Sequence, residues 1–172
     1  VGMIGLGRMG EGMSRRLIAA GHEVWGYRNN YEKSCEQYEA GYISGCTTSV
    51  ESLVQMIHSY KSVSERKPGV FMIAVPQENV EETLDDLLRL CREGDIIINY
   101  GNSNIEDCWK REERSAKFGV AYIDCDVDRN ICDVDSGYNL MVRGGDTAIA
   151  TCKNIFHDLG TWKFTTKHSS VI

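Results

Sequence analysis

The spacing of three glycines near the start of the chain limits its possible folds more than any other feature. Gly5, Gly7 and Gly10 form a G-x-G-x-x-G pattern between an apolar run and an amphipathic segment. The first glycine permits a tight turn, the second lets the backbone approach a pyrophosphate, and the third lets a helix pack against a strand. The helix N-terminus offers N–H groups and a positive dipole end to phosphate. We predict a dinucleotide-binding turn at Gly5, Leu6, Gly7, Arg8, Met9 and Gly10. The alternative is a turn that serves only close packing.

Short apolar runs alternate with amphipathic segments along the whole chain, which is typical of a parallel sheet covered by helices. We expect strands at 1–5, 23–27, 70–75, 95–99, 120–124, 138–142 and 161–164. We expect helices at 9–20, 31–40, 50–60, 80–92, 105–118 and 147–159. The length of 172 residues suits one domain rather than two. The predicted fold is α/β, with a doubly wound, mostly parallel sheet and helices on both faces, forming a single Rossmann-type NAD(P)-binding domain over 1–172.

Composition narrows the class of protein. Hydrophobic residues make up 42% and charged residues 26%, with a net charge of -6, which is ordinary for a globular chain. No apolar run approaches the roughly 18 residues of a membrane span, and no basic tract lies beside clustered aromatic residues. The seven cysteines contain no C-x-x-C pair, so neither a disulfide framework nor a zinc knuckle is predicted. We expect a cytoplasmic protein that binds neither nucleic acid nor a membrane.

One acidic segment has the spacing of a calcium-binding loop at Asp124, Asp126, Asp128, Asn130 and Asp135. The position where such a loop turns sharply needs glycine, and this chain has Arg129 there. The segment also follows an expected strand rather than a helix. We therefore predict no metal site, with calcium as the lesser alternative.

The residue after the second expected strand bears on the choice of dinucleotide. NAD-binding versions of such a domain place an acidic residue there to hold the ribose hydroxyls. This chain has Arg28, whose guanidinium can form charge-assisted hydrogen bonds with a 2′-phosphate. Such bonds contribute about 1.5 to 3 kcal/mol, which gives about a tenfold to hundredfold preference. We expect NADP rather than NAD, with Asn29 and Asn30 as supporting contacts and a solvated Arg28 as the alternative.

A resemblance to a known family rests on the stretches 1–10, Gly21–Val24, Pro76, Gly94–Ser103 and Gly137–Val142. Over essentially its whole length the chain resembles the N-terminal domain of 6-phosphogluconate dehydrogenase, in the β-hydroxyacid dehydrogenase group. The resemblance implies an NADP-dependent oxidoreductase of the pentose phosphate pathway. It implies that Asn102 lies beside both the nicotinamide and a sugar-acid substrate and orients one against the other. Val75 and Pro76 are then expected on the nicotinamide side, and Ser103 as a helix cap.

The chain departs from the family pattern at two places. Tyr100 stands where the family has glycine, so we expect its ring to change the shape of the pocket. Asp126–Asn130 stands where the family has a Gly-Thr-Ser-Gly-Gly-like loop that receives the substrate. Carboxylates there repel an anionic sugar phosphate by about 1 kcal/mol in water and by more at lower dielectric. An altered substrate loop is expected, and another hydroxy acid or an imine stays open as the substrate.

The family takes its catalytic lysine and glutamate from a large helical region that follows the sheet domain. This chain ends at Ile172 without a counterpart, so we expect it to bind cofactor without turnover. We expect an oligomer only where the helical region is present. The apolar run that starts at Val1 indicates that a few native residues precede it. The alternative from another class is a non-catalytic cofactor-binding or interaction module.

Overall fold

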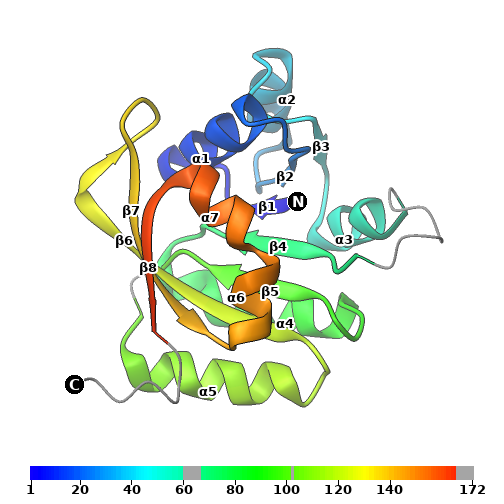
Figure 1. Ribbon diagram of the computed structural model, residues 1–172. Helices are drawn as coiled ribbons and strands as arrows, with labels where there is room; N and C mark the ends of the chain where they lie inside the picture. The colour runs from blue at the N-terminus through cyan, green and yellow to red at the C-terminus, as the bar shows by residue number, and fades with distance from the viewer. Residues whose placement is uncertain (60–66, 102, 166–172) are drawn as a thin grey trace.

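The fold is that of a computed structural model, which describes residues 1–59, 67–101 and 103–165, with the backbone alone at 129–133 (Figure 1). Its sheet holds β1 (Gly2–Ile4), β2 (Trp25–Tyr27), β3 (Gly45–Thr47), β4 (Val70–Ile73), β5 (Ile96–Asn99), β6 (Ala121–Asp133), β7 (Gly137–Gly144) and β8 (Gly160–Thr165). The helices are α1 (Arg8–Ala19), α2 (Tyr31–Glu39), α3 (Val50–Ser59), α4 (Val80–Leu90), α5 (Ile105–Ala116), α6 (Asp146–Thr151) and α7 (Lys153–Leu159), with a short 3-10 helix at Gln77–Asn79.

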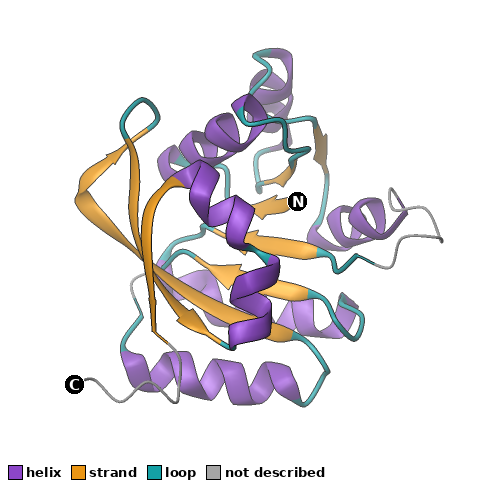
Figure 2. Cartoon of the chain, viewed as in Figure 1, coloured by secondary structure: helices purple, strands orange, loops and turns teal. Residues whose placement is uncertain are grey.

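The strands form one sheet in the order β3-β2-β1-β4-β5-β6-β7-β8. Neighbouring strands are parallel except for β6 and β7, which are antiparallel. The chain runs from β1 outward to one edge, returns to β4 beside β1, and continues to the other edge. Helices connect most of the parallel strands and cover both faces of the sheet (Figure 2). The predicted doubly wound, mostly parallel α/β fold is confirmed.

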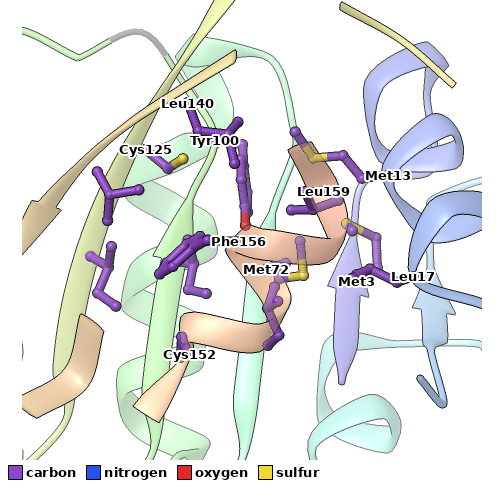
Figure 3. Packing of buried hydrophobic residues seen from close by; sticks show 14 of the residues in the cluster. Met3, Met13, Leu17, Met72, Tyr100, Cys125, Leu140, Cys152, Phe156 and Leu159 are labelled. Carbon is purple, nitrogen blue, oxygen red and sulfur yellow. The ribbon is translucent and has the colours of Figure 1, made fainter. Parts of the chain in front are cut away.

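Alternate residues of the central strands face opposite sides of the sheet. Met3 and Met72 belong to a buried cluster with side chains of α1, α6 and α7, part of which Figure 3 shows. Ile4 and Ile73 belong to a second cluster with side chains of α3 and α4. The strands are therefore buried on both faces, as parallel sheets usually are. No helix in the described part of the chain is both long and apolar enough to cross a membrane.

Three parts of the fold differ from the sequence prediction, and two of them are β3 and the last helical segment. β3 is not predicted, because Gly45–Thr47 contains only three residues and no apolar run. The helix expected at 147–159 is divided at Cys152, whose backbone departs from helical geometry at φ -92° and ψ 5°. The last two helices are therefore short, and they pack on the sheet as separate pieces.

The predicted loop at Asp126–Asn130 is part of a long strand instead. β6 extends to Asp133 and pairs with β7 as an antiparallel hairpin. Ile123, Cys125 and Val127 are buried on one face of this strand. These buried residues alternate with aspartates at every second position. This period-two pattern favours a strand and outweighs the preference of aspartate for turns. A paired strand does not have the backbone of a calcium-binding loop, and the described residues contain no group of three or more His, Cys, Asp or Glu side chains that could hold a metal ion.

The turn of the β6–β7 hairpin contacts α1. Arg16 of α1 donates from Nη1 to the carbonyl oxygen of Val134 at 2.7 Å, and from Nε to that of Asp158 at 3.3 Å. Gly12 of α1 leaves room for Tyr138, since an added Cβ would overlap the tyrosine hydroxyl. The first helix, the hairpin and α7 are therefore joined by direct contacts.

Candidate dinucleotide site

The glycine turn at 5–10 connects β1 to α1, and two of its glycines are required by the protein itself. Gly5 has a φ of +92°, and an added Cβ would lie 2.5 Å from the carbonyl oxygen of Ala74. At Gly10 an added Cβ would overlap the carbonyl oxygen of Gly5. The turn is anchored by the Gly5 amide, which donates to the carbonyl oxygen of Tyr27 at 2.9 Å. These contacts explain why a helix can follow β1 so closely.

Gly7 is different, because nothing in the fold requires a glycine there. It precedes α1 with an ordinary φ of -75°, and an added Cβ would meet no atom within 4 Å. The first amides of α1 lack carbonyl partners within the helix, as at any helix N-terminus. Because Gly7 has no side chain, a ligand can reach the unpaired amides at the N-terminus of α1. Such a site suits a pyrophosphate. Contact of the glycine-turn residues, Arg8 and Met9 included, with a dinucleotide stays a prediction.

Arg28 lies at the carboxyl end of β2 and is directly connected to the glycine turn. Its Nη1 donates to the carbonyl oxygen of Leu6 at 3.0 Å. Gln37 of α2 donates to the same oxygen at 3.1 Å and to the carboxylate of Glu11 at 2.8 Å. In the described part of the chain, no carboxylate pairs with Arg28. Its remaining N–H groups are therefore available to an anion beside the turn.

The two asparagines that follow Arg28 make local hydrogen bonds. Asn29 Oδ1 accepts from the Tyr27 hydroxyl at 3.1 Å. Asn30 caps α2, where its Oδ1 accepts from the Lys33 amide at 3.1 Å. Both use their oxygens in this way and keep their side-chain NH₂ groups as donors. Contact of Asn29 and Asn30 with a cofactor stays a prediction.

Val75 and Pro76 follow β4 at the same edge of the sheet. The Val75 amide nitrogen would lie 2.9 Å from a Cβ added at Gly5, so this segment lies directly against the glycine turn. Val75 is half-buried and Pro76 is exposed. An added Cβ at Gly101 would lie 2.9 Å from Gln77 Oε1, which places the segment after β5 beside the one after β4. The fold therefore brings the predicted phosphate and nicotinamide segments to one edge, as parallel strands require.

The segment after β5 carries the predicted substrate contact, and Asn102 itself lies outside the described residues. Ser103 is not the helix cap that we predicted. Asn104 caps α5 instead, with its Oδ1 accepting from the Asp107 amide at 2.8 Å. The Ser103 hydroxyl instead accepts from Arg111 Nη1 at 2.6 Å and from Asn99 Nδ2 at 3.2 Å. Ser103 is thus held by two buried side chains.

Tyr100 does not project into a pocket, which corrects the prediction that its ring changes the pocket shape. The side chain is 3% exposed and lies in the cluster with Leu140 and Phe156, as Figure 3 shows. Burial raises the pKa of Tyr100 well above its usual value. Its hydroxyl has no hydrogen-bond partner within the described residues. The ring fills the core beneath the segment and leaves the edge of the sheet free.

A buried polar cluster behind Ser103 was missed by the sequence analysis. We call it the Arg111 network, and it consists of Asn99, Ser103, Arg111 and Asp124. Asn99 Nδ2 donates to Asp124 Oδ1 at 3.0 Å, and Arg111 also pairs with Glu81 at 2.7 Å. Burial raises the pKa of Asp124, against the opposing effect of the hydrogen bond from Asn99. Nothing in the sequence distinguishes Arg111 from the other charged residues of α5.

A cleft of about 580 Å³ lies beside this network. Its lining residues are Ser103, Asn104, Asp126, Val127, Asp128, Asn139, Leu140, Met141 and Lys163. Arg143 pairs with Asp126 at 2.6 Å and with the buried Asp124 at 3.5 Å. Of the two carboxylates that we expected to repel an anion, Asp126 is therefore paired with a positive charge from within the protein. The cleft suits a polar molecule, and Lys163 brings a further positive charge to its wall.

Comparison with known proteins identifies the family of the chain. The family model described as the NAD binding domain of 6-phosphogluconate dehydrogenase matches residues 1–168. The chain belongs to this family. The resemblance on which the sequence analysis relied is confirmed, and the chain is a nicotinamide-dinucleotide-binding domain of oxidoreductases like 6-phosphogluconate dehydrogenase.

Among related proteins, the NAD(+)-dependent decarboxylating 6-phosphogluconate dehydrogenase of Haloferax volcanii is 29% identical over 161 residues, which cover 94% of this chain and 50% of that protein. The structure of Psf3 in complex with NADP+ and 2-OPP matches with a TM-score of 0.79 and 21% identity, over 96% of this chain and 56% of that one. The 3-hydroxyisobutyrate dehydrogenase of Mycobacterium tuberculosis gives a TM-score of 0.78 with 18% identity, over 96% and 53%. The chain spans half or less of the length of the curated relatives it matches.

Proposed function

We propose that this chain binds NADP+ in preference to NAD+, as the cofactor domain of a decarboxylating dehydrogenase that acts on a sugar acid such as 6-phosphogluconate. The chain would hold the dinucleotide and one side of the substrate cleft, with the family's helical region supplying the proton-transfer groups and an oligomer contact. Curated relatives named 6-phosphogluconate dehydrogenase support this assignment. The pentose phosphate pathway and a cytoplasmic location belong to the same proposal.

The observation that carries the cofactor preference is the placement of Arg28. It lies where an acidic residue would hold the ribose hydroxyls of NAD. Its bond to the Leu6 carbonyl oxygen orients the guanidinium beside the glycine turn. A 2′-phosphate there gains charge-assisted hydrogen bonds, whereas NAD+ gains none. Both dinucleotides occur among the similar proteins, since the Haloferax relative is named as NAD(+)-dependent and the Psf3 structure holds NADP+.

Calorimetric titration of the chain with NADP+ and with NAD+ tests the proposal. We expect NADP+ to bind about tenfold to a hundredfold more tightly, and Arg28→Ala to lose that preference. Arg89→Ala is the matched control, because Arg89 is highly exposed on α4 and pairs only with Asp86 in the described residues. Equal binding of both dinucleotides by the wild-type chain, or a preference that survives Arg28→Ala, would contradict the assignment.

A second candidate keeps the oxidoreductase class and changes the substrate to another hydroxy acid or an imine. Asp126 and Asp128 line the cleft where the family has a loop without carboxylates, and this favours a substrate with less negative charge there. The two candidate substrates are distinguished with a protein that joins this chain to a helical region of the family. Its turnover of 6-phosphogluconate is compared with its turnover of 3-hydroxyisobutyrate and of a cyclic imine. The interaction-module alternative is supported if the chain binds neither dinucleotide at millimolar concentration.

A further inference from the structure

Two thiols lie close together, one in the helix that follows the predicted 2′-phosphate segment and one in the strand that pairs with β2. Cys35 is in the middle of α2 and Cys46 is in β3, and their sulfur atoms are 3.7 Å apart. Both side chains are half-buried, so small reagents can reach them. The two sulfurs must approach by less than about 2 Å to reach the length of a disulfide bond. No other pair of described cysteines has its sulfur atoms in such a contact.

Three of the other described thiols lie in surroundings that strongly disfavour the thiolate. Burial raises the pKa of Cys91, Cys108 and Cys152 to about 12, so their reactive thiolates are scarce. Burial also raises the pKa of Cys46. Cys46 is thus better suited to the second, intramolecular step of an exchange reaction, where proximity compensates for a small thiolate fraction.

The position of the pair connects it to the cofactor segment. α2 begins at Tyr31, immediately after the segment of Arg28, Asn29 and Asn30. Tyr31 lies beside both thiols. Hydrogen bonding with Cys35, and to a smaller extent with Cys46, raises the pKa of Tyr31 to about 12. From the next turn of α2, Gln37 bonds to the Leu6 carbonyl oxygen that Arg28 also contacts. A shift of α2 toward β3 would therefore act on the groups around Arg28.

We propose that Cys35 and Cys46 are a reversible thiol–disulfide site, and that forming the disulfide weakens binding of the dinucleotide. The oxidant is a small disulfide such as glutathione disulfide. The Cys35 thiolate attacks one sulfur of it and releases one glutathione thiolate; the Cys46 thiolate then attacks the Cys35 sulfur and releases the second. Two protein thiols lose two electrons and two protons in total, and one glutathione disulfide becomes two glutathione molecules. The coupling to the cofactor rests on the proposed function, whereas the disulfide does not.

The first test needs no cofactor. The chain is equilibrated with reduced and oxidised glutathione at a series of ratios, trapped with iodoacetamide and mapped by peptide mass spectrometry. We expect a linked Cys35–Cys46 peptide that disappears in Cys35→Ser and in Cys46→Ser, where the remaining thiol carries glutathione instead. Cys91→Ser is the control and should retain the linked peptide. Absence of that peptide at every ratio, or a different partner for Cys35, overturns the site.

The second test measures the coupling. NADP+ is titrated into the reduced and the oxidised chain, and we expect the dissociation constant to rise about fivefold on oxidation. The double variant Cys35→Ser/Cys46→Ser, which has neither thiol at this site, should show no rise under the same oxidising treatment. Equal affinity of the two wild-type forms, with the disulfide fully formed, overturns the coupling. Failure of the reduced chain to bind either dinucleotide contradicts the proposed function instead, and the peptide map still decides whether the disulfide forms.

Discussion

The glycine turn and the Arg111 network lie at the same edge of the sheet but are built by opposite means. The turn works through missing side chains, since Gly5 and Gly10 admit backbone contacts that a Cβ would block. The network works through large polar side chains that are almost fully buried, Arg111 at 4% exposure and Asp124 at 0%. A site made of backbone needs close packing, whereas a site made of buried charges needs every charge to be paired. The two regions should therefore respond differently to substitution.

The largest effect is expected at Gly10. Gly10→Ala places a methyl group on the Gly5 carbonyl oxygen, so α1 must move away from β1. We expect the free energy of unfolding to fall by about 3 kcal/mol, as measured by urea denaturation followed by circular dichroism. An unchanged free energy of unfolding in Gly10→Ala would show that the turn tolerates a shift of α1. The glycine turn would then not depend on close packing in the way that contrasts it with the Arg111 network.

Arg111→Ala should destabilise the chain by about 2 kcal/mol, because Ser103 loses a donor and Glu81 loses one of its two arginine partners. Arg114→Ala is the matched control, since Arg114 pairs with the same Glu81 from a more exposed position and should cost less than about 1 kcal/mol. Dinucleotide affinity should be unchanged in both variants. Equal losses of stability in the two variants would show that burial of Arg111 is unimportant.

Gly7→Ala should separate binding from stability. Because an added Cβ meets no protein atom within 4 Å, we expect the free energy of unfolding to change by less than about 1 kcal/mol. The methyl group should obstruct the pyrophosphate and weaken NADP+ binding about tenfold, which corresponds to about 1.4 kcal/mol. Calorimetry and urea denaturation on the same preparation check both parts. Unaltered affinity would mean that the phosphates do not approach Gly7.

The smallest expected effect is a pH dependence at Asp124. Its pKa is raised by burial, so the folded chain holds this proton more tightly than the unfolded chain does. The contribution of the protonated carboxyl to stability is full below the unfolded pKa and declines as pH rises through the raised value. Asp124→Asn cannot titrate, so the free energy of unfolding of the wild type minus that of the variant should fall as pH rises above the unfolded pKa of about 4. A difference that grows with pH would contradict this assignment.

The sequence predicted the architecture and the glycine turn because both depend on local patterns. Apolar periodicity identifies strands and helices, and the three glycines report backbone geometry directly. The sequence did not predict the Arg111 network, because it joins residues from β5, β6 and α5 whose side chains meet only after folding. The β6 segment shows a different failure. Its aspartates suggested a loop, although Ile123, Cys125 and Val127 already carried the alternation of a strand.

Tyr100 illustrates a third limit of sequence reasoning. Comparison with the family glycine suggested that a large residue would change the shape of the pocket. Side-chain direction at that position is set by the strand before it, however, and it sends the ring into the core. Residue size alone therefore says little about a site until the face on which the residue lies is known.

The contacts of Arg16 determine how the chain could be divided. They join α1, from the first tenth of the chain, to the carbonyl oxygens of Val134 and Asp158 near its other end. A fragment that stops after β5 would retain the glycine turn and lose these partners, leaving the face of α1 around Gly12 uncovered. The two halves of this doubly wound sheet are therefore not separable modules, and hydrogen exchange should show the amides of α1 and of the hairpin opening together as one cooperative unit.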